Sequence, residues 1–595
     1  MEPSRRHFVV GFLLLPKAWR SLVAGPAKAG SCPNLSVAPT FRSASAGLKA
    51  SATTEISTAP KAEHDEPLGR YFAKKQYTPS ALPRFEQLRE QLPSPIYDAN
   101  PLLVQTYWKA WELAFKNFYE PAPGSGFVSQ FIDAAFSKNI FLWDSCFMTM
   151  FCNYAYPLVP GISTLDNFYA RQHEDGEISR EIVRATGVDF GPWINREQRS
   201  LFSRWGWPSY RESASRNRNA AVVYQGRAIP QPPPKLTLDA LDHPLLAWAE
   251  LESYRVTGNK DRLELVWEPL VQYYRALEKY LSQGNGLYVT DWASMDNSPR
   301  NRYLKRGGTG IDISSEMVLF ARQLSEIAAT LGKQDQAGRF AREADALATL
   351  INRHMWDPKR EFYFDLTLKG KRAPVKTVAA YWTLLAKAAA PAQASALVKE
   401  LHNAATFGRL NRVPTVAADE HGYDPKGGYW RGSLWAPTQT MVIRGLENYG
   451  YSDLARELAL SHLDLVAQVF KKTGTIWENY APDAIEPGKP AKGDFVGWSG
   501  IGPITYLLEY AIGLKPDAPH NQLFWDLQRE ARAGCERFRF NGHVASLVAE
   551  PVVGGQGKVR VSVESDGDFK LRVRYKGKQQ DFSLAPGKQE FTLSS

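Results

Sequence analysis

An irregular segment that contains an acidic residue stands out in the middle of the sequence. Residues 286–303 read GLYVTDWASMDNSPRNRY and place Asp296 between Met295 and Asn297, with Trp292 close by. No helical or strand period runs through the segment, so it is predicted to be a loop held by a rigid scaffold. Catalytic residues often lie on such loops. Because apolar neighbours desolvate the ionised form of a carboxyl group and raise its pKa, Asp296 is a candidate proton donor near neutral pH.

A second carboxylate lies in similar surroundings. Glu478 is flanked by Trp477 and Tyr480 in the segment GTIWENYAPD. Hydrolysis of a glycosidic bond needs two carboxyl groups, one to protonate the leaving oxygen and one to activate water or attack the sugar. Asp296 as acid and Glu478 as base would meet this need. Each residue taken alone also fits a structural role, since Asp before Asn-Ser-Pro is common in turns and a Glu near a helix start is often half of an ion pair.

Acids, Arg or Asn lie beside Trp or Tyr in three further regions. These are residues 141–181, which begin FLWDSCFMTMF, residues 427–446 (GGYWRGSLWAPTQTMVIRGL) and residues 474–510 around Glu478. Each region lies at the start of a predicted helix. In a closed ring of helices such starts gather on one face, so we expect the regions to converge on one pocket.

The composition and the motifs present exclude several other functions. The sequence has no Gly-rich phosphate loop, no Gly-x-Ser-x-Gly motif and no Cys/His spacing typical of zinc, so no cofactor is predicted. No calcium motif is recognisable either, although calcium binding and oligomeric state stay open. Residues 1–30 carry about +4 of the net charge of +10, with five Lys or Arg against Glu2, and the rest is scattered along the chain. No basic run alternates with aromatic residues, so nucleic-acid binding is not expected.

The scaffold is predicted to be mainly helical. Apolar residues recur three and four apart in residues 101–118, 241–258, 316–333, 336–356, 376–389, 393–405, 437–448, 452–470 and 502–513. Gly258, Gly332 and Gly450 follow three of these segments, where a helix end favours a left-handed residue. Long helices without βαβ alternation predict an (α/α)6 barrel, a toroid of helical hairpins, over residues 95–536. A helical solenoid is the alternative, but no fixed-period repeat is present.

Both ends of the chain differ from this helical region. Residues 1–30 contain SRRHFVV and an Ala-Lys-Ala site, which resemble a twin-arginine signal and predict export to the periplasm or the medium of a bacterium. The apolar stretch is too short to span a membrane, so no integral membrane segment is expected in the mature protein. Residues 31–94 are predicted to be a flexible linker, and residues 537–595 alternate apolar and polar residues as in a small antiparallel β domain.

The motifs resemble those of glycoside hydrolase family 63 and its trehalase-like relatives, the six-hairpin glycosidases. The similarity covers residues 105–515 and includes SMDNSPR, YWRGSLW, WENYAPD with GWSG, FLWDSCF and GIDISSE in the family's order. It implies an inverting hydrolase of O-glycosyl bonds, with Asp296 as general acid and Glu478 as general base, about 6.5–9.5 Å apart. It also implies substrate contacts by Trp143, Asp144, Trp292, Asn297, Arg300, Asp312, Tyr429, Trp430, Arg431, Trp435, Trp477 and Trp498.

We therefore expect an exported, exo-acting enzyme whose partner is an oligosaccharide or glycoside. The family resemblance favours an α-linked glucoside or mannoside. The alternatives are another (α/α)-barrel carbohydrate enzyme, such as an α-L-rhamnosidase-like hydrolase or a polysaccharide lyase, and a non-catalytic sugar-binding relative. Two features depart from the family pattern: Arg180 and Glu181 follow the family's Asp-Gly-x-Ile motif, and the insert at 204–236 contains none of the family's motifs. The two charges could reach a charged aglycone or cap a helix.

Overall fold

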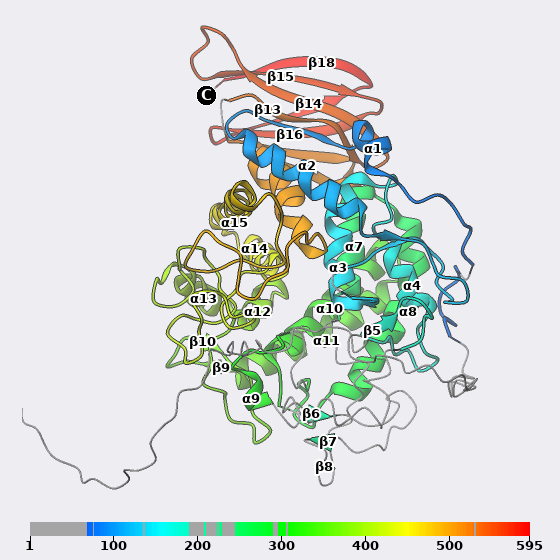
Figure 1. The fold of residues 1–595 in the computed structure, drawn as a ribbon, viewed down its shortest axis with the longest axis vertical. Coiled ribbons are helices and arrows are strands. Elements are labelled where there is room, and N and C mark those ends of the chain that lie inside the picture. Colours follow the sequence, from blue (N-terminus) through cyan, green and yellow to red (C-terminus); the bar gives the residue numbers. More distant parts are fainter. Residues whose placement is uncertain are drawn as a thin grey trace, which may run out of the picture. The chain divides into compact units, whose positions relative to one another are not determined.

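The computed structural model describes residues 68–74, 76–134, 137–189, 244–289, 295–304, 308–528 and 531–594. It also describes three short strands between residues 190 and 243: β6 (Pro208–Ser209), β7 (Val223–Tyr224) and β8 (Arg227–Ala228). The predicted signal (1–30), most of the predicted linker and most of the 204–236 insert lie outside the described residues. Helices are the main regular structure of the described residues, and the long strands follow them in the sequence (Figure 1).

Six helices contact one another in cyclic order. They are α3 (Leu142–Cys152), α7 (Leu246–Thr257), α10 (Ile311–Thr330), α12 (Trp382–Leu385), α14 (Ala436–Asn448) and η7 (Ile501–Ile512). Because η7 contacts α3, the series of contacts returns to its start. Every residue of α3 and of η7 is buried, as expected for helices that are covered on all sides.

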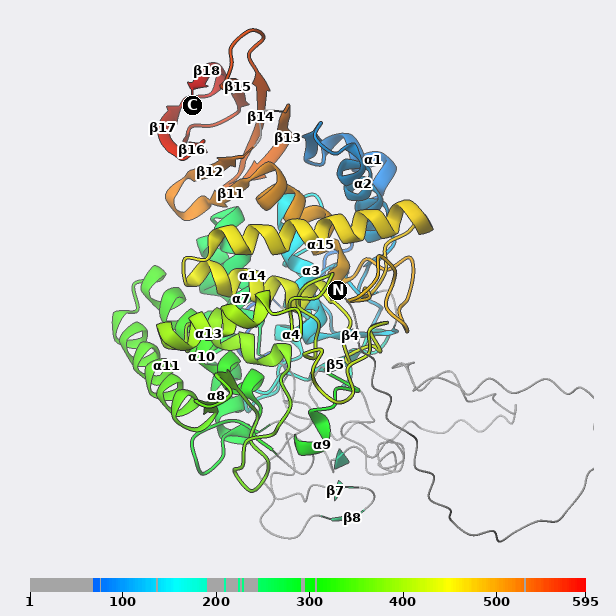
Figure 2. The ribbon, with the colours of Figure 1, turned by 90° about the vertical axis from the view of Figure 1, so that its left-hand side faces the viewer.

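A second set of helices flanks this ring. It consists of α2 (Pro101–Phe115), α4 (Thr164–Ala170), α8 (Lys260–Leu281), α11 (Gln334–His354), α13 (Pro391–His402) and α15 (Ser452–Thr473). Helix α11 lies beside α10, and α15 lies beside α14 (Figures 1 and 2). The buried residues of α11 include Phe340, Ala344, Leu347 and Ile351, spaced three and four apart, so only one face of this helix packs on the ring.

The predicted helical segments are confirmed as helices. Their bounds differ by a few residues, and the segment 376–389 divides into η5 (Val378–Tyr381) and α12. Gly258, Gly332 and Gly450 have φ values of 67°, 78° and 79°, so all three adopt the predicted left-handed conformation at a helix end. Helix α8 was not predicted. The remaining helices are short: α1 (Phe85–Leu88), η2 (Arg89–Gln91), η3 (Asn153–Ala155), α9 (Asn301–Leu304), η6 (Trp498–Gly500) and η8 (Ala518–His520).

The C-terminal strands form two sheets. The first has the order β1-β13-β14-β15-β18 and consists of β1 (Ser94–Tyr97), β13 (Ala533–Phe540), β14 (His543–Pro551), β15 (Lys558–Ser565) and β18 (Gly587–Ser594). The second has the order β11-β12-β16-β17 and consists of β11 (Leu514–Asp517), β12 (Gln522–Leu527), β16 (Phe569–Tyr575) and β17 (Lys578–Leu584). The pairs are antiparallel as predicted, except that β12 and β16 run parallel.

Two predicted boundaries differ from the structure. The β region begins at Leu514 and not at residue 537. Strand β1 of the first sheet begins at Ser94, the last residue predicted as linker, and continues to Tyr97 in the segment predicted as barrel. The strands pack on the helices, because the Trp525 indole N–H donates to the Ile512 carbonyl at 3.0 Å. The described part of the predicted linker is also packed, since the Lys74 ammonium lies 2.9 Å from the Asp166 carboxylate.

Short strand pairs lie among the helices. They are β2 (Phe118–Tyr119) with β3 (Phe131–Ile132), β4 (Asn139–Phe141) with β5 (Glu181–Val183), and β9 (Trp356–Asp357) with β10 (Phe362–Tyr363). Across the described ranges, no helix is long and apolar enough to cross a membrane, and no group of three or more His, Cys, Asp or Glu side chains could hold a metal ion. Cys146, Cys152 and Cys535 are buried as free thiols.

Candidate active site

The predicted site regions meet at the starts of the ring helices. Trp143 lies in the first turn of α3, Trp430 precedes α14, and Trp498 begins η6, which leads into η7. The ring centroid of Trp143 lies 6.4 Å from that of Trp430 and 6.3 Å from that of Trp498. Segments more than 350 residues apart in the sequence therefore converge, as the sequence predicted.

These tryptophans form a continuous aromatic cluster with Trp435. The Trp430 and Trp435 rings stack at 4.4 Å with an interplanar angle of 5°, and Trp435 lies 5.8 Å from Trp498. Trp435 is 1% exposed, whereas Trp143, Trp430 and Trp498 are 6%, 4% and 4% exposed. All four rings are thus buried, Trp435 most completely, and the substrate contact that the family resemblance implied for Trp435 stays a prediction.

Glu478 is held from several sides beside this cluster. Its Oε1 accepts a hydrogen bond from the Tyr429 hydroxyl at 3.3 Å, and its Oε2 accepts one from the Lys492 peptide N–H at 3.1 Å. The Trp498 indole N–H donates to the backbone carbonyl of Glu478 at 3.2 Å. Burial raises the pKa of the Glu478 carboxyl to about 7, while the two hydrogen bonds favour its ionised form.

Asp296 lies within electrostatic reach of Glu478. Burial raises the pKa of the Asp296 carboxyl to about 7, and the positive charge of Arg180 opposes this rise. The negative charge of Asp296 in turn raises the pKa of Glu478. Two coupled carboxyl groups that both titrate near neutral pH can share one proton there, so that one acts as a proton donor and the other as a base.

Tyr429 lies at the centre of the acidic groups. Burial raises the pKa of its hydroxyl, and the charges of Glu478, Asp296 and Asp144 raise it further. Three carboxylates thus surround one phenol. Its backbone is left-handed, with φ 66°, and follows Gly427 and Gly428 at 102° and 54°. Left-handed backbone is costly for a Tyr, so the surrounding contacts must hold Tyr429 in this orientation.

The loop that carries Asp296 is fastened to the Tyr429 segment by Asn297. The Asn297 side-chain amide donates to the Gly428 carbonyl, and its oxygen accepts from the Trp430 peptide N–H, both at 2.9 Å. The Asn301 amide donates to the Met295 carbonyl at 2.8 Å. These contacts use the oxygen and one N–H of the Asn297 amide, so Asn297 positions the acid loop, and its contact with substrate stays a prediction.

Behind the loop, Arg300 forms a buried ion-pair network with two aspartates. Its guanidinium contacts Asp312 at 2.5 Å and Asp365 at 2.6 Å, and the three side chains are 1–2% exposed. The predicted substrate contacts of Arg300 and Asp312 are therefore wrong for the geometry observed, because protein groups occupy the polar atoms of the arginine. Both residues instead support the Asp296 loop from inside. Asp365 was not predicted, because it lies in no recognisable motif.

The other predicted residues are placed as follows. Arg431 is exposed, and its Nε donates to the Gly422 carbonyl at 2.8 Å. Trp477 is half-buried, and its indole N–H donates to the Thr473 hydroxyl at 3.0 Å, at the end of α15. No contact of either side chain with the aromatic cluster is found among the described residues. Trp292 lies outside the described residues.

Arg180 and Lys492 are two cations that the predicted site residues did not include. The Arg180 carbonyl accepts from the Leu142 peptide N–H at 3.0 Å, extending the β4–β5 ladder to the start of α3. Arg180 is buried, and its charge acts on Asp296 as described above. Lys492 contacts Glu478 through its backbone. The sequence signal for Arg180 was its departure from the family pattern, whereas Lys492 lies in an ordinary polar stretch.

Aromatic side chains fill the interior of the ring below Trp143. The ring centroids of Trp143 and Phe147 lie 4.7 Å apart, those of Phe147 and Trp248 5.5 Å apart, and those of Trp248 and Trp382 6.0 Å apart. These residues come from α3, α7 and α12, and none is more than 6% exposed. The interior between these helices is therefore packed under the candidate site.

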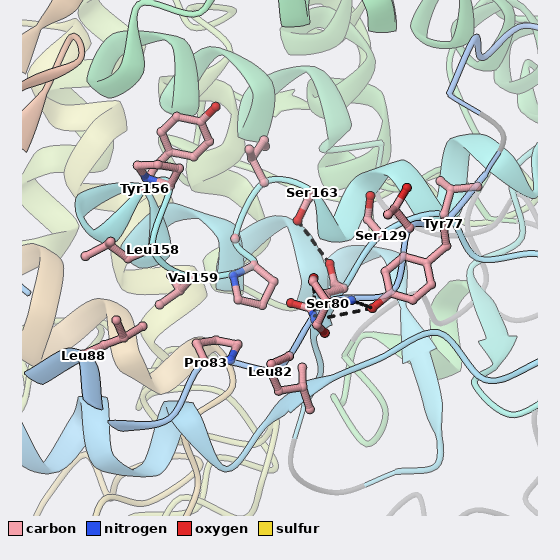
Figure 3. A pocket seen from close by; sticks show the side chains of 18 of the residues that line it. Tyr77, Ser80, Leu82, Pro83, Leu88, Ser129, Tyr156, Leu158, Val159 and Ser163 are labelled. Carbon is pink, nitrogen blue, oxygen red and sulfur yellow. Dashed lines mark hydrogen bonds between the residues drawn. The ribbon is translucent and has the colours of Figure 1, made fainter. Parts of the chain in front are cut away.

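A separate cavity of about 720 Å³ lies beyond the other end of α3. It is lined by residues of the segments 74–88, 128–130 and 156–163, among them Tyr77, Leu82 and Tyr156 (Figure 3). Helix α3 has 11 residues, so its two ends are roughly 16 Å apart. None of the predicted catalytic or substrate-binding residues lines this cavity, which is thus distinct from the candidate active site.

Comparison with known proteins points to carbohydrate hydrolysis. Residues 231–499 match the family model of the mannosylglycerate hydrolase MGH1-like glycoside hydrolase domain. An uncharacterized protein of Borreliella burgdorferi is 26% identical over 352 residues, which cover 57% of this chain and 72% of that protein. A probable mannosyl-oligosaccharide glucosidase of Schizosaccharomyces pombe is 24% identical over 251 residues, 40% of this chain and 31% of that protein.

A solved structure supports the fold. The α-L-rhamnosidase of Dictyoglumus thermophilum matches with a TM-score of 0.52 at 12% identity, over 85% of this chain and 50% of that enzyme. The chain spans about a third of the length of the curated glucosidase and trehalase relatives it matches. The family match and these relatives together confirm the predicted resemblance: the chain is similar to the glycoside hydrolases of family 63 and the related trehalase-like enzymes.

Proposed function

We propose that this glycoside hydrolase is an inverting, exo-acting enzyme that uses Asp296 as general acid and Glu478 as general base. The Asp296 carboxyl donates its proton to the glycosidic oxygen as the bond from that oxygen to the anomeric carbon breaks. Glu478 takes a proton from a water molecule, and the water oxygen bonds to the anomeric carbon from the opposite face. This pathway needs a carboxyl separation of about 6.5–9.5 Å, so that the water fits between the two groups.

One observation carries the proposal: the buried carboxyl group of Glu478 and the half-buried carboxyl group of Asp296 interact electrostatically, and desolvation raises the pKa of each to about 7 beside a cluster of tryptophans. Near pH 7 such a pair can hold one proton. The hydrogen bonds from Tyr429 and Lys492 favour the ionised form of Glu478, which suits the base. Arg180 favours the ionised form of Asp296, so the proton donor depends on burial to keep its proton.

We propose that the six contacting helices and their flanking partners form an (α/α)6 barrel, in support of which the contacts return from η7 to α3. The packed chain Trp143–Phe147–Trp248–Trp382 supports exo-action, because a site closed beneath by aromatic side chains accepts the end of a sugar chain. A site open along its length would instead accommodate internal segments of a polysaccharide.

For the substrate we propose an α-linked glucoside or mannoside, the sugars named for the glucosidase relative and for the matched family model. A second candidate is a glycoside whose aglycone carries a carboxylate. It is favoured by Arg180, a buried cation that acts on the proposed acid and so lies on the side of the departing group. For such a substrate, Arg180→Met should raise KM much more than for the corresponding aryl glycoside.

The test is a release assay combined with NMR. Protein that lacks residues 1–30 is offered p-nitrophenyl α- and β-glycosides of glucose, mannose and rhamnose, α-linked disaccharides and mannosylglycerate. ¹H NMR then identifies the anomer formed first. Release of the β-anomer from an α-glycoside supports inversion, whereas first release of the α-anomer contradicts it. Turnover of the rhamnoside alone would favour the rhamnosidase alternative.

We also propose that residues 1–30 direct export to the periplasm. The Arg5-Arg6 pair ahead of a short apolar stretch supports this proposal. Replacing both arginines by lysine should leave the full-length protein in the cytoplasm of a bacterial host, as measured by cell fractionation. Unchanged export would contradict the twin-arginine assignment.

A further inference from the structure

The Tyr429 side chain holds one oxygen of the proposed base. Its hydroxyl donates to Oε1 of Glu478 at 3.3 Å, while Oε2 accepts from the Lys492 peptide N–H at 3.1 Å. The Tyr429 ring packs edge-on against Trp435, with centroids 4.8 Å apart and an interplanar angle of 79°. The phenol therefore reaches Glu478 from a ring that is itself supported by the aromatic cluster.

The backbone of Tyr429 is attached on both sides to the loop that carries Asp296. The Asn297 amide donates to the Gly428 carbonyl, and its oxygen accepts from the Trp430 peptide N–H, both at 2.9 Å. These two groups belong to the peptide units that precede and follow Tyr429. Because Asn297 comes directly after Asp296, one side chain next to the proposed acid fixes both peptide units around Tyr429.

The segment that contains Tyr429 is also paired with the strand that contains Glu478. The Leu434 peptide N–H donates to the Tyr480 carbonyl at 2.9 Å, and the Tyr480 peptide N–H donates to the Leu434 carbonyl at 3.0 Å. Between these anchors Tyr429 has a left-handed φ of 66°, a conformation that a tyrosine keeps only where its surroundings determine it. The strained backbone thus marks a residue whose side-chain direction is fixed by the contacts around it.

We propose that Tyr429 is a positioning residue that links the proposed acid to the proposed base: Asn297 fixes its backbone, and its hydroxyl orients the Glu478 carboxylate. This inference rests on the proposed function. An inverting enzyme needs a separation between its two carboxyl groups that admits one water molecule. A direct link between the Asp296 loop and Glu478 keeps this separation constant, so Tyr429 acts on the reaction through Glu478.

The charged groups around this link set the effect of removing the hydroxyl. The Asp296 charge raises the pKa of Glu478, whereas the hydrogen bond from Tyr429 and the Lys492 charge lower it. The charges that act on Tyr429 are those of Glu478, Asp296 and Asp144. Since Tyr429→Phe removes the hydrogen bond and leaves these charges in place, the pKa of Glu478 should rise in this variant.

The experiment compares wild type with Tyr429→Phe on the aryl glycoside that turns over fastest. The variant keeps the ring but releases Oε1 of Glu478, so kcat should fall about 10-fold with KM within about twofold of wild type. The acidic limb of the kcat/KM profile should move upward by about 0.5–1 pH unit. The matched control is Tyr423→Phe, because the Tyr423 hydroxyl donates to a different carboxylate, that of Asp483, at 2.9 Å. This control should keep the wild-type profile.

A double-mutant cycle tests the link to the acid loop. Asn297→Ala alone should move the acidic limb in the same direction as Tyr429→Phe, because it releases the backbone that aims the hydroxyl. The double variant should have a kcat within about threefold of that of Asn297→Ala, since both changes break one link. Fully multiplicative losses or an acidic limb that does not move in Asn297→Ala would overturn the inference.

Two results for Tyr429→Phe would also overturn it. A raised KM at unchanged kcat would mean that Tyr429 acts by contacting the sugar, as the family resemblance implied. A profile that superimposes on that of wild type, or an equal loss at every pH, would show that the hydroxyl does not act through Glu478. Full activity of Glu478→Gln would instead overturn the proposed function, so the two failures are distinguishable.

Discussion

Replacement of Arg300 by methionine should destabilise the protein and not simply weaken substrate binding. The Arg300 guanidinium is 1% exposed and makes two hydrogen bonds to each of two aspartates, Asp312 and Asp365. Methionine fills a similar volume but leaves two buried carboxylates without their cation. Breaking a buried ion pair by removing one partner costs about 3–5 kcal/mol.

The size of the thermal shift follows from this cost. Unfolding entropies are about 2 cal/mol/K per residue. For a cooperative unit of roughly 450 residues, the free energy of unfolding near the melting temperature therefore changes by about 0.9 kcal/mol per kelvin. The Arg300→Met variant should therefore melt about 3–5 °C below wild type at pH 7 in scanning calorimetry. Burial already raises the pKa of the Asp365 carboxyl with Arg300 present, and this pKa should rise further without the arginine. A carboxyl group whose pKa is higher in the folded than in the unfolded chain lowers the free energy of unfolding as the pH rises. The loss of stability relative to wild type should therefore be smaller at pH 5 than at pH 7.

The matched control is Arg302→Met on the same loop. Arg302 is exposed and its guanidinium donates to the Tyr303 hydroxyl at 2.6 Å, so its replacement should change stability by no more than about 0.5 kcal/mol. Adding Asp312→Asn and Asp365→Asn to Arg300→Met should recover part of the loss. If Arg300→Met has the melting temperature of wild type and differs only in a raised KM, the reasoning is refuted, because Arg300 would then act by binding substrate.

Three further predictions concern other groups. The pH profile of kcat/KM should be a narrow bell centred near pH 7, because Glu478 gains a proton below its pKa of about 7 and Asp296 loses its proton above its pKa of about 7. Steady-state rates between pH 5 and 9 test this prediction, and a broad plateau would contradict it. Asn297→Ala removes two 2.9 Å hydrogen bonds that align the loop carrying Asp296, so single-turnover rates should fall about 10- to 100-fold. The melting temperature should be nearly unchanged. An unaffected rate would exclude the positioning role of Asn297. His462 is 2% exposed, neither ring nitrogen has a hydrogen-bond partner in the described chain, and burial lowers its pKa to about 4. The unfolded chain binds a proton near pH 6.5 and the folded one does not, so stability falls between pH 6.5 and 4 by about 3 kcal/mol; calorimetry of His462→Leu should show this part of the fall removed, and an equal fall in both proteins would contradict it.

The helical part of the fold was predictable because periodic apolar residues mark it directly. Helix α11 shows this clearly, with one apolar face and polar residues elsewhere. The start of the β region was missed because β11 and β12 are short and β11 contains Pro516, so neither shows clear alternation in the sequence. The pairing of β1 with β13 joins residues more than 430 positions apart, which no local pattern indicates.

The site was predictable in its segments but not in the roles of individual side chains. Asp296 and Glu478 could be singled out because each acid is followed or preceded by apolar and aromatic residues. In the segment that carries Asp296, the sequence alone did not distinguish Asn297 and Arg300 from residues that face the sugar. Their partners are Gly428 and Asp365, 131 and 65 positions away, and only the folded chain brings them together.

The most direct test of the account is the turnover of one glycoside by wild type, Asp296→Asn and Glu478→Gln, each of which keeps the shape of the side chain and removes its acid–base function. The account predicts that both variants lose at least about a hundredfold in kcat, because general acid and base catalysis each contribute about 10²–10⁴-fold. It also predicts melting temperatures at or above that of wild type, since a neutral amide replaces a buried carboxyl. A variant at either position that retains kcat within about threefold would contradict the assignment of that residue, and retention by both would contradict the central claim.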